Sequence, residues 1–521
     1  MKAITSAQMR ELDKLATSEF AIASAELMRR AGEGVALIVA DIADRARLGD
    51  AFIQVMAGRG NNGGDAFVAA HYLHEQDFDV EVLLAATAGD IRGDALLHFS
   101  KMRSAGIPVR ELPTNEDWED ALENANAGQI LVDGILGIGV SGPPRGPAAA
   151  AIHYLNVISE DNTVISIDVP SGLNADTGES PGETVVADVT ATIGMPKNGL
   201  LAQAAIPYVG SLDVVGIGIP MDLTSRYDCR RELITDWDVR RNFRRRPHDA
   251  HKGLYGHVLV IGGAVGYTGA PTLAARAAHR VGTGLVSLLV PRAIYPVAAA
   301  ATLEVMTHPG ADTETGSLGI PSWNDWKDRV NEFDAVVIGP GLTRHPDSAL
   351  WVRNLLLECK RPLVLDADAL NVLEGNPEWM ARAKAPVVIT PHPGEMARLL
   401  GCKVADVQAD REGAAQQAAK LTGAVVVLKG AGTLVAHKDQ PLCVNLTGNP
   451  GMATGGMGDV LAGIVGGFLA QGVVPFEAAK AGVFVHGRAG DNAAWRTSQI
   501  GLGAADVIAE LPYVFRELVT R

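Results

Sequence analysis

A glycine-rich segment near the C-terminal end of the chain has the composition of a phosphate site. Residues 449–459 read Asn-Pro-Gly-Met-Ala-Thr-Gly-Gly-Met-Gly-Asp and lead into an apolar helical run over residues 460–470. Free backbone N–H groups beside the positive end of a helix dipole bind phosphate oxygens. We expect the carboxylate of Asp459 to take a proton from an attacking hydroxyl, which predicts phosphoryl transfer. Acidic residues are also favoured in a first helical turn without any function, so this segment alone leaves both interpretations open.

A second glycine-rich turn lies in the first half of the chain. An apolar run leads into Gly-Arg-Gly-Asn-Asn-Gly-Gly-Asp at residues 58–65, and a helical run follows. A strand, a glycine turn and a helix can form a nucleotide-phosphate site at the carboxyl edge of a sheet. The spacing differs from the dinucleotide fingerprint, and such turns are common without function. The adjacent Asn61 and Asn62 favour a ligand site, because a tight turn needs at most one residue that tolerates left-handed geometry.

Polar side chains end two further predicted strands of this half. One strand ends in Asp133 before a second glycine-rich loop at residues 137–143, and another ends in Asp168. An aspartate in such a place often only caps a helix or forms a turn. Ligands of open α/β sheets nevertheless bind at these strand ends. The side-chain oxygens of Asn62, Asp133 and Ser171 also suit a hard cation.

Both halves of the chain alternate short β-rich apolar runs with alanine-rich helical runs. This alternation predicts an α/β fold in which helices cover both faces of parallel sheets. The polar segment 220–249 lacks a sustained period, so we place a boundary near residue 225, between domains of residues 1–222 and 223–521. We expect strands at residues 51–57, 80–85, 130–133, 163–168, 188–193 and 213–217 in the first half, and at residues 257–261, 285–290, 335–338, 363–366, 387–390 and 424–428 in the second.

The composition argues against several classes of protein. With 521 residues the chain can bury two cores, and its net charge of −15 disfavours nucleic-acid binding. The dense basic cluster at residues 240–246 is interpreted as a linker. Four separated cysteines without a Cys-x-x-Cys pair disfavour a disulfide framework and fit a reducing cytoplasm. Neither a membrane-spanning run nor a signal peptide is evident, so we expect a cytoplasmic protein with no membrane partner.

The motifs together resemble one family over nearly the whole chain. Residues 1–220 resemble the N-terminal domain of the YjeF family, and residues 225–521 resemble its C-terminal, ribokinase-like partner. The resemblance implies a Rossmann-like doubly wound sheet followed by a ribokinase-like α/β domain. The matching motifs are Gly-Asn-Asn-Gly-Gly-Asp (60–65), Asp-Val-Pro-Ser-Gly (168–172), Tyr-Gly-His-Val-Leu-Val-Ile-Gly-Gly (255–263), Asp-Ala-Asp-Ala-Leu-Asn (366–371), Thr-Pro-His-Pro-Gly-Glu (390–395), Lys429-Gly430 and the Asp459 loop.

This resemblance implies two reactions on hydrated NAD(P)H, abbreviated NAD(P)HX. The N-terminal domain would interconvert the R and S epimers, with K⁺ as its cofactor. The C-terminal domain would use ADP to phosphorylate the hydroxyl of the S epimer, so that phosphate leaves, the nicotinamide ring is restored and AMP is released. We expect Mg²⁺ to support this second reaction. The implied small-molecule partners are NADHX, NADPHX and ADP, and we expect a homo-oligomer that binds no nucleic acid.

In the N-terminal domain the resemblance implies a substrate site around the two glycine-rich loops. Asp168 would contact the hydrated cofactor and is our candidate for proton transfer. Asn62, Asp133 and Ser171 would bind potassium. Ala66 and Ile138 stand where the family often has glycine and threonine, which leaves the loop geometry open. The implied substrate contacts are Asn61, Asn62, Gly63, Gly64, Asp65, Gly137, Ile138, Gly139, Val140, Ser141, Gly142, Pro143 and Asp168.

In the C-terminal domain the resemblance implies that Asp459 activates the hydroxyl of the hydrate. Ala270, Gly341 and His392 would contact the same substrate. A lone histidine is more often structural, but one in a Pro-His-Pro-Gly turn after a strand is well placed for a ligand. Met457 stands where threonine is more frequent. ADP and AMP would be bound by Lys429, Gly430, Ala431, Gly432, Thr433 and Gly458.

Three other functions compete with this interpretation. An ATP-dependent vitamin or sugar kinase with a nucleotide-sensing N-terminal domain would share the Asp459 loop. A nicotinamide-dependent oxidoreductase would explain two glycine-rich loops, although their spacing differs from the usual fingerprint. The first half could also be a non-enzymatic interaction module attached to a working C-terminal enzyme.

Overall fold

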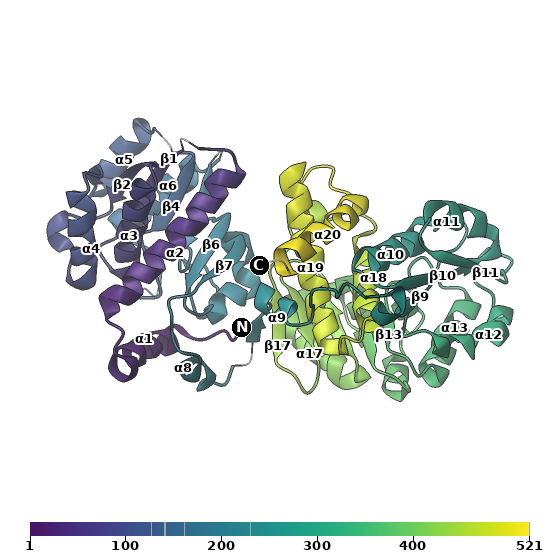
Figure 1. The fold of residues 1–521 in the computed structure, drawn as a ribbon. Helices are drawn as coiled ribbons and strands as arrows, with labels where there is room; N and C mark the ends of the chain where they lie inside the picture. Colours follow the sequence, from purple (N-terminus) through teal and green to yellow (C-terminus); the bar gives the residue numbers. More distant parts are fainter. Residues whose placement is uncertain (50, 127, 140–141, 161, 230, 520–521) are drawn as a thin grey trace. The chain divides into compact units, whose positions relative to one another are not determined.

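The chain folds into two compact α/β units, Met1–Leu233 and Ile234–Arg521 (Figure 1). The computed structural model describes residues 1–519 apart from residues 50, 127, 140–141, 161 and 230. The boundary expected near residue 225 lies a few residues ahead of the division between the units. Across the described residues, every helix is too short or too polar to cross a membrane.

The first unit contains a parallel sheet with the strand order β3-β2-β1-β4-β5-β6-β7. The chain passes from β1 outward to β2 and β3, then returns to the other side of β1 to form β4. The strand order therefore reverses between β1 and β4, which opens a crevice at their carboxyl ends. The strands are β1 (Phe52–Ala57), β2 (Asp79–Leu84), β3 (Val109–Glu111), β4 (Ile130–Gly134), β5 (Thr163–Ile167), β6 (Val189–Ile193) and β7 (Ser211–Val215).

Helices cover both faces of this sheet. Ile53 and Val55 of β1 belong to a core shared with α2 and α3, whereas Met56 belongs to a separate core shared with α5 and α6. Burial on both faces explains why the strands read as nearly continuous apolar runs. The helices are α1 (Ser6–Phe20), α2 (Ser24–Arg45), α3 (Asn61–Glu75), α4 (Gly93–Ser104), α5 (Asn115–Glu123), α6 (Pro147–Ile158), α7 (Ile206–Val209) and α8 (Met221–Ser225).

The sheet of the second unit repeats this plan, with the strand order β11-β10-β9-β12-β13-β14-β15-β16-β17. The order reverses between β9 and β12, and the strands are parallel up to β15, after which β16 and β17 run antiparallel. A short strand, β8 (Arg231–Leu233), ends the first unit. The strands of the second are β9 (His257–Ile261), β10 (Leu285–Pro291), β11 (Met306–Gly310), β12 (Ala335–Ile338), β13 (Leu363–Leu365), β14 (Val387–Ile389), β15 (Val425–Leu428), β16 (Thr433–Ala436) and β17 (Leu442–Asn445).

Four helices of the second unit, α10, α18, α19 and α20, share one large core with β9 and β12. The helices of this unit are α9 (Asp236–Arg240), α10 (Gly269–Arg280), α11 (Tyr295–Ala301), α12 (Pro321–Trp326), α13 (Pro346–Glu358), α14 (Asp368–Asn371), α15 (Pro393–Leu400), α16 (Val404–Ala409), α17 (Arg411–Thr422), α18 (Met457–Ala470), α19 (Pro475–Arg496) and α20 (Ala504–Val519).

The backbone of helix α18 packs very closely against helix α10 and strand β12. A Cβ atom added to Gly463 would stand 2.0 Å from the carbonyl oxygen of Ala274 in α10, and one added to Gly466 would stand 2.1 Å from a methyl of Val337 in β12. A Cβ on Gly467 would meet side chains that follow α10 at 2.6–2.7 Å. These glycines let the helix carry the Asp459 loop close to the sheet.

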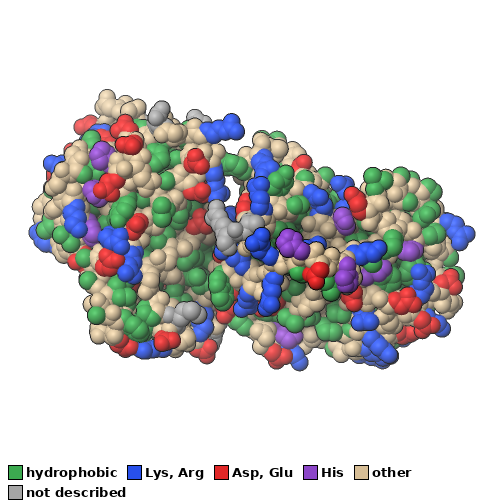
Figure 2. Space-filling view, in the orientation of Figure 1, with side chains coloured by type: hydrophobic (Ala, Val, Ile, Leu, Met, Phe, Trp, Pro, Cys, Tyr) green, Lys and Arg blue, Asp and Glu red, His purple; other side chains and the backbone are tan. Residues whose placement is uncertain are grey.

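The predicted fold class is confirmed, and each expected strand has an observed counterpart. The sequence patterns missed β3, β8, β11, β16 and β17, which are short or lie near a sheet edge, where alternation is weak. The arginine-rich segment expected to be a linker is anchored in the second unit, because the Phe243 ring packs 4.9 Å from Phe468 and 5.3 Å from Phe515. Figure 2 shows side chains of both charge signs interspersed over the visible face of each unit.

Candidate active sites

The turn after β1 lies at the base of the candidate site, where the strand order reverses between β1 and β4. The Gly58 amide donates to the Gly134 carbonyl at 3.0 Å, and a Cβ on Gly58 would stand 2.0 Å from the carbonyl oxygen of Ile135. A Cβ on Gly63 would stand 1.8 Å from the carbonyl oxygen of Gly58. Backbone packing therefore requires these glycines. Because α3 begins at Asn61, its first backbone N–H groups lie at this edge of the sheet, an arrangement that suits an anionic group.

The structure brings together the three residues expected to bind potassium. The Asn62 amide donates to the Leu136 carbonyl at 2.8 Å, and the Leu136 amide donates to the Ser171 hydroxyl at 2.8 Å. That hydroxyl donates to one oxygen of Asp133 at 2.5 Å. The other oxygen of Asp133 accepts at 2.8 Å from both the Ser171 amide and the Ser166 hydroxyl. One connected network therefore joins the ends of β4 and β5 to the start of α3.

Asp133 is a buried carboxyl without a positively charged partner among the described residues. Its side chain is fully buried, and burial raises the pKa of the carboxyl although hydrogen bonds from Ser171 and Ser166 lower it. Within the described part of the chain no lysine or arginine pairs with it. A buried carboxylate of this kind is costly unless a cation compensates it. The oxygen-rich surroundings fit a hard cation such as K⁺.

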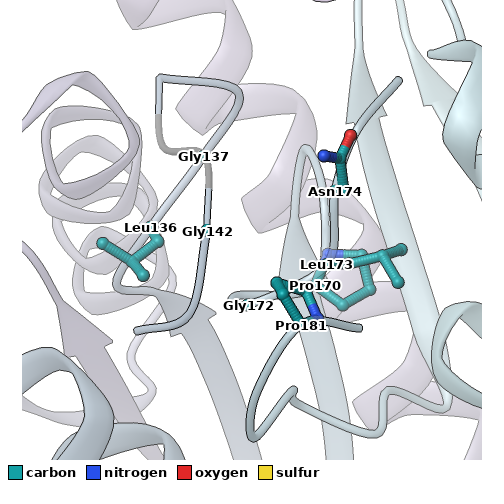
Figure 3. A pocket seen from close by; sticks show the side chains of 8 residues that line it. All are labelled: Leu136, Gly137, Gly142, Pro170, Gly172, Leu173, Asn174 and Pro181. Atoms are coloured by element: carbon teal, nitrogen blue, oxygen red, sulfur yellow. The ribbon is translucent and has the colours of Figure 1, made fainter. Parts of the chain in front are cut away.

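A pocket lies between the second glycine-rich loop and the turn after β5 (Figure 3). The Asn174 side chain and the backbone of Gly137, Gly142 and Gly172 reach it. The expected site residues Val140 and Ser141 lie outside the described residues. The complete lining is Leu136, Gly137, Gly142, Pro170, Gly172, Leu173, Asn174 and Pro181.

Asp168 directly follows β5 and has a left-handed backbone, with φ of 67°. A non-glycine residue in this conformation is strained, which is a recurrent feature of functional sites. Its Oδ1 atom accepts from the Ile193 amide at 3.1 Å and from the ammonium of Lys197. The Lys197 side chain is fully buried and donates further to the Ile193 carbonyl at 2.8 Å and to Thr192 Oγ1 at 3.3 Å. The other Asp168 oxygen has no protein partner among the described residues.

Two more carboxyls share this environment. Burial raises the pKa of Asp13 to about 6, with Lys197 lowering it and Asp168 raising it. Burial also raises the pKa of Asp65 well above its ordinary value, and the charges of Asp168 and Asp13 add to that effect. Sequence reasoning missed Asp13 and Lys197, because one lies on an ordinary amphipathic helix and the other follows a strand without a glycine motif.

In the second unit the strand ends align at one edge. Ile261, Ile338, Leu365 and Ile389 are in register across β9, β12, β13 and β14, so the residues that follow these strands lie side by side. Helix α18 starts at Met457 behind Gly456, whose φ is 90°, and Asp459 lies in its first turn. The expected loop-to-helix geometry at Asp459 is therefore present.

Asp459 belongs to a cluster of carboxylates around one lysine. The ammonium of Lys429 lies 2.8 Å from Asp366 Oδ1 and 3.8 Å from Glu395 Oε2. A Cβ added to Gly458 would stand 3.0 Å from that ammonium. Desolvation lowers the pKa of Lys429, but the charges of Asp366, Glu395 and Asp459 outweigh it and leave the pKa raised.

The pKa of Asp459 is raised to about 7. Burial is the main cause, the charge of Asp366 adds to it, and Lys429 opposes it. A carboxyl with this pKa can accept a proton near neutral pH, as a general base must. Burial likewise raises the pKa of Glu395.

The backbone around Asp366 is tightly constrained. Its Oδ1 accepts from the Thr390 hydroxyl at 2.7 Å, and the next residue, Ala367, has φ of 48°. Asp368 accepts from the Thr343 amide at 2.9 Å, which ties the turn after β13 to the turn after β12. These contacts hold the carboxylates at the carboxyl edge of the sheet.

His392 is the N-cap of α15. Its Nδ1 accepts from the Gly394 amide at 2.9 Å, and its Nε2 lies 3.4 Å from Glu395 Oε1. Burial lowers the pKa of His392, and the positive charges of Lys429 and Arg398 lower it further. The ring thus has a structural role through one nitrogen, while its half-exposed side chain stays within reach of the site.

The expected nucleotide loop follows β15. Gly430 and Gly432 have φ of 131° and 63°, and the Thr433 hydroxyl closes the turn by donating to the Gly430 carbonyl at 2.7 Å. The buried Arg411 guanidinium donates to the carbonyls of Leu428, Lys429 and Gly432 at 3.2–3.5 Å. Arg411, at the start of α17, therefore fixes a loop that is far from it in sequence.

The remaining expected residues also come together. A Cβ on Gly341, which has φ of 64°, would stand 3.4 Å from the Cβ of Ala270. Sequence reasoning missed His486 of α19, whose Nε2 is buried without a partner in the described chain. Burial lowers the pKa of His486 to about 4, and Lys429 lowers it further. A histidine inside a long helix carries no motif that could have revealed it.

Comparison with known proteins gives the same division of the chain. The family described as YjeF-related protein N-terminus matches residues 24–199, and that described as NAD(P)H-hydrate dehydratase matches residues 258–513. A solved structure, the ADP/ATP-dependent NAD(P)H-hydrate dehydratase from Bacillus subtilis co-crystallised with ATP/Mg²⁺, is 30% identical with a TM-score of 0.48, over 55% of this chain and 98% of that chain.

Full-length relatives carry both regions. The bifunctional NAD(P)H-hydrate repair enzyme Nnr of Moorella thermoacetica is 40% identical over 99% of this chain and 97% of its own length. The enzyme of the same name from Coxiella burnetii is 39% identical over 97% of each chain. That from Escherichia coli is 35% identical over 95% of this chain and 90% of its own. With these matches across both units, the chain belongs to the family of bifunctional NAD(P)H-hydrate repair enzymes.

Proposed function

We propose that the second unit dehydrates the S epimer of NAD(P)HX by phosphorylating it. Hydroxide is a poor leaving group near neutral pH, whereas phosphate leaves readily when electrons from the ring nitrogen expel it, and loss of a proton from the neighbouring carbon then restores the ring double bond. ADP would bind at the loop after β15 and at the N-terminus of α18, donate its β-phosphoryl group to the ring hydroxyl, and leave as AMP. Stabilisation of the transferred phosphoryl by backbone N–H groups is the usual contribution of a helix N-terminus.

Asp459 is the observation that carries this proposal. It stands in the first turn of α18, beside the Gly458 backbone and the Lys429 ammonium, and its pKa is about 7. A base of this strength takes the hydroxyl proton as the oxygen attacks phosphorus. In this reaction Ala270, Gly341 and His392 would contact the hydrate, while residues 429–433 and Gly458 would bind the nucleotide.

We propose that the first unit interconverts the R and S epimers. Asp168 would act as a base, because Lys197 and the Ile193 amide hold one of its oxygens while the other stays free for the substrate. The glycine-rich loops at residues 58–65 and 137–143 would bind the phosphates and ribose of the cofactor. The epimerase would then supply S hydrate to the dehydratase.

Potassium is proposed as the cofactor of the first unit. K⁺ would bind near Asn62, Asp133 and Ser171 and compensate the buried charge of Asp133. Replacing Asp133 by Ala should therefore slow epimerisation in K⁺ buffer at least tenfold and leave ADP-dependent dehydration of S hydrate intact. Rates measured for both reactions, in K⁺ and in Na⁺, check this. An equal loss of both activities, or no loss of either, would contradict the assignment.

Magnesium is proposed for the second unit. Its site holds Asp366, Glu395 and Asp459 around one lysine, so a bound polyphosphate would be repelled without an added cation. Among the described residues no group of three ligating side chains forms a ready metal site. This fits Mg²⁺, which is usually bound by substrate phosphates, water and one or two carboxylates.

A single assay tests the proposed function. The protein is incubated with both hydrate epimers, ADP, K⁺ and Mg²⁺, and the return of nicotinamide absorbance is followed together with the formation of AMP. Complete repair of both epimers, with one AMP per NAD(P)H, is expected. Turnover of ATP on an unrelated alcohol, with no absorbance gain on hydrate, would instead indicate a kinase with a nucleotide-sensing first half.

The cellular setting is also a proposal. We place the enzyme in the cytoplasm, where its cofactor substrates and ADP occur. Cys229, Cys359 and Cys402 form no disulfide, which fits a reducing compartment. We expect a homo-oligomer. Light scattering on the purified full chain tests that expectation.

A further inference from the structure

The segment before α2 lies outside the matched region of residues 24–199, yet it is built into the epimerase site. Ile4 forms a parallel bridge with Lys197. The Ile4 amide donates to the Pro196 carbonyl at 3.0 Å, and the Asn198 amide donates to the Ile4 carbonyl at 2.9 Å. The residues on both sides of Lys197 are thus held by the N-terminal segment.

Helix α1 turns one face toward the site. The methyl group of Met9 borders Gly194, since a Cβ there would stand 2.7 Å from it. The Arg10 guanidinium donates to the carbonyl of Ile138, in the second glycine-rich loop, at 3.0 Å. Asp13 is four residues after Met9 and three after Arg10, so it shares their side of the helix. Its carboxyl is half-buried and has no hydrogen-bond partner in the described chain. The charge of Lys197 lowers its pKa, and the charge of Asp168 raises it.

Lys197, the ionisable side chain that contacts Asp168, is already engaged in hydrogen bonds. Lys197 uses its three N–H groups on Asp168, Thr192 and the Ile193 carbonyl, so it cannot give up a proton without breaking that network. An acid must therefore come from a different residue.

We propose that Asp13 is the acid of the epimerase site, working opposite the base Asp168, and that α1 is part of the catalytic apparatus. This inference rests on the proposed epimerase function. Epimerisation needs one acid and one base on either available route. If the ring opens, Asp168 takes the hydroxyl proton as the carbon–nitrogen bond breaks to give an aldehyde, and Asp13 protonates the nitrogen; reclosure reverses both transfers.

If an iminium forms instead, Asp13 protonates the hydroxyl, which leaves as water as the nitrogen lone pair forms the new double bond. Water then adds to the opposite face and gives a proton to Asp168, and exchange with solvent water moves that proton to Asp13. Each route returns the site to its starting protonation, so no further reactant is consumed.

Two carboxyls near Asp168 have raised pKa values. Burial raises the pKa of Asp13 to about 6, so it can both give and regain a proton near neutral pH. Burial raises the pKa of Asp65 as well, and the charges of Asp168 and Asp13 add to that effect. Carboxyls whose environments push their pKa values apart are the usual basis of acid and base assignments.

The test compares Asp13→Asn with Glu11→Gln, which removes an exposed acid from the same helix. Separated R hydrate is converted to S hydrate without ADP from pH 5 to 8, and spontaneous epimerisation is subtracted. Wild type and Glu11→Gln should lose rate as pH rises above about 6, as Asp13 loses its proton. Asp13→Asn should lose about 10²- to 10⁴-fold in kcat and lack that dependence.

Three controls keep the result interpretable. Thermal unfolding of Asp13→Asn should match wild type, which shows that the first unit is folded. ADP-dependent dehydration by Asp13→Asn should equal wild type, which shows that the second unit is unaffected, and Asp13→Glu should recover part of the epimerisation with a shifted pH dependence. Asp13→Asn with a wild-type rate, an unchanged pH profile, or a change in KM alone would overturn the inference. If wild type and Glu11→Gln also fail to epimerise, the proposed epimerase function itself is wrong.

Discussion

Asp459 must be basic enough to take a proton and still remain beside phosphate. Asp459→Asn keeps the size of the side chain but cannot accept the hydroxyl proton. Dehydration of S hydrate should therefore fall by about two to four orders of magnitude. ADP binding should largely survive, because the loop amides and Lys429 remain. Initial rates and calorimetric ADP titration of the variant check this, with the exposed Asp439→Asn as control; a near-normal rate would reduce Asp459 to a helix-start residue.

The pH dependence of dehydration follows from the same residue. The pKa of Asp459 is raised to about 7, so in the free enzyme the base is mostly protonated below that pH. We expect kcat/KM for S hydrate to fall tenfold per pH unit below about 7, because the deprotonated fraction falls at that rate. A profile from pH 5 to 9, with ADP saturating, measures it. A profile that stays flat down to pH 5 would show that Asp459 is not the base.

Ionisation of Asp459 should also lower the free energy of unfolding. Its pKa is raised from 3.8 to about 7 on folding, so the folded state prefers the neutral form and loses stability as pH rises from about 4 to about 7. Asp459→Asn removes this penalty, on the order of 4 kcal/mol at pH 8. Thermal unfolding at pH 4 and pH 8 should show a gain in Tm only at the higher pH. An equal gain at both would point to a cause other than ionisation.

Asp168 separates the two activities. Asp168→Asn should abolish interconversion, so that with ADP present the variant repairs S hydrate while R hydrate drains no faster than it epimerises spontaneously. A time course on mixed epimers measures both pools. Equal consumption of the two epimers would remove Asp168 from the mechanism.

At the residue scale, the sequence identified residues that stand in motifs and missed those that reach the site by folding. Asp168 and Asp459 follow a strand or open a helix, where general rules expect ligands. Lys197, Asp13 and His486 have no such signal. Lys197 is fully buried and meets Asp168 only because β6 lies beside β5 in the sheet. Side-chain partners of this kind depend on tertiary packing.

Arg411 shows how an element can position a site from a distance. Its guanidinium holds three carbonyls around the nucleotide loop, and each would lose its donor in Arg411→Leu. Unpaired buried carbonyls cost about 1–3 kcal/mol each, so the loop should loosen. We expect KM for ADP to rise about tenfold or more with a smaller change in kcat. Lys420→Ala, an exposed change on the same helix, is the matched control, and an unchanged KM would contradict the role of Arg411.

The sequence predicted strands correctly where both faces of the strand are buried. The central strands β1, β4, β9 and β12 are buried on both faces and read as apolar runs, so the sequence located them closely. The hairpin of β16 and β17 was missed because its first strand starts directly at Thr433, inside the expected nucleotide loop. A glycine-rich turn gives no indication that a strand follows within the same few residues.

At the scale of the whole molecule, two sheets of the same design each place a site at a reversal of strand order. Each unit has its own core, and the residues proposed for each site belong to a single unit. We therefore expect residues 1–233 and 234–521 to fold separately, the first retaining epimerisation and the second retaining dehydration of S hydrate. Expression of both pieces and assays of both reactions check this. Two insoluble pieces would indicate that the units stabilise one another.

The close packing of α18 against its neighbours determines which substitutions this protein tolerates. Gly463, Gly466 and Gly467 each face a different neighbour, so a single added methyl would push the whole helix outward and carry Asp459 with it. In a saturation mutagenesis screen that selects for repair, these three positions should be as intolerant as Asp459, the proposed base, although none lies in the candidate site. Substitutions at these glycines would therefore abolish repair by displacing the helix, although they change no reacting group.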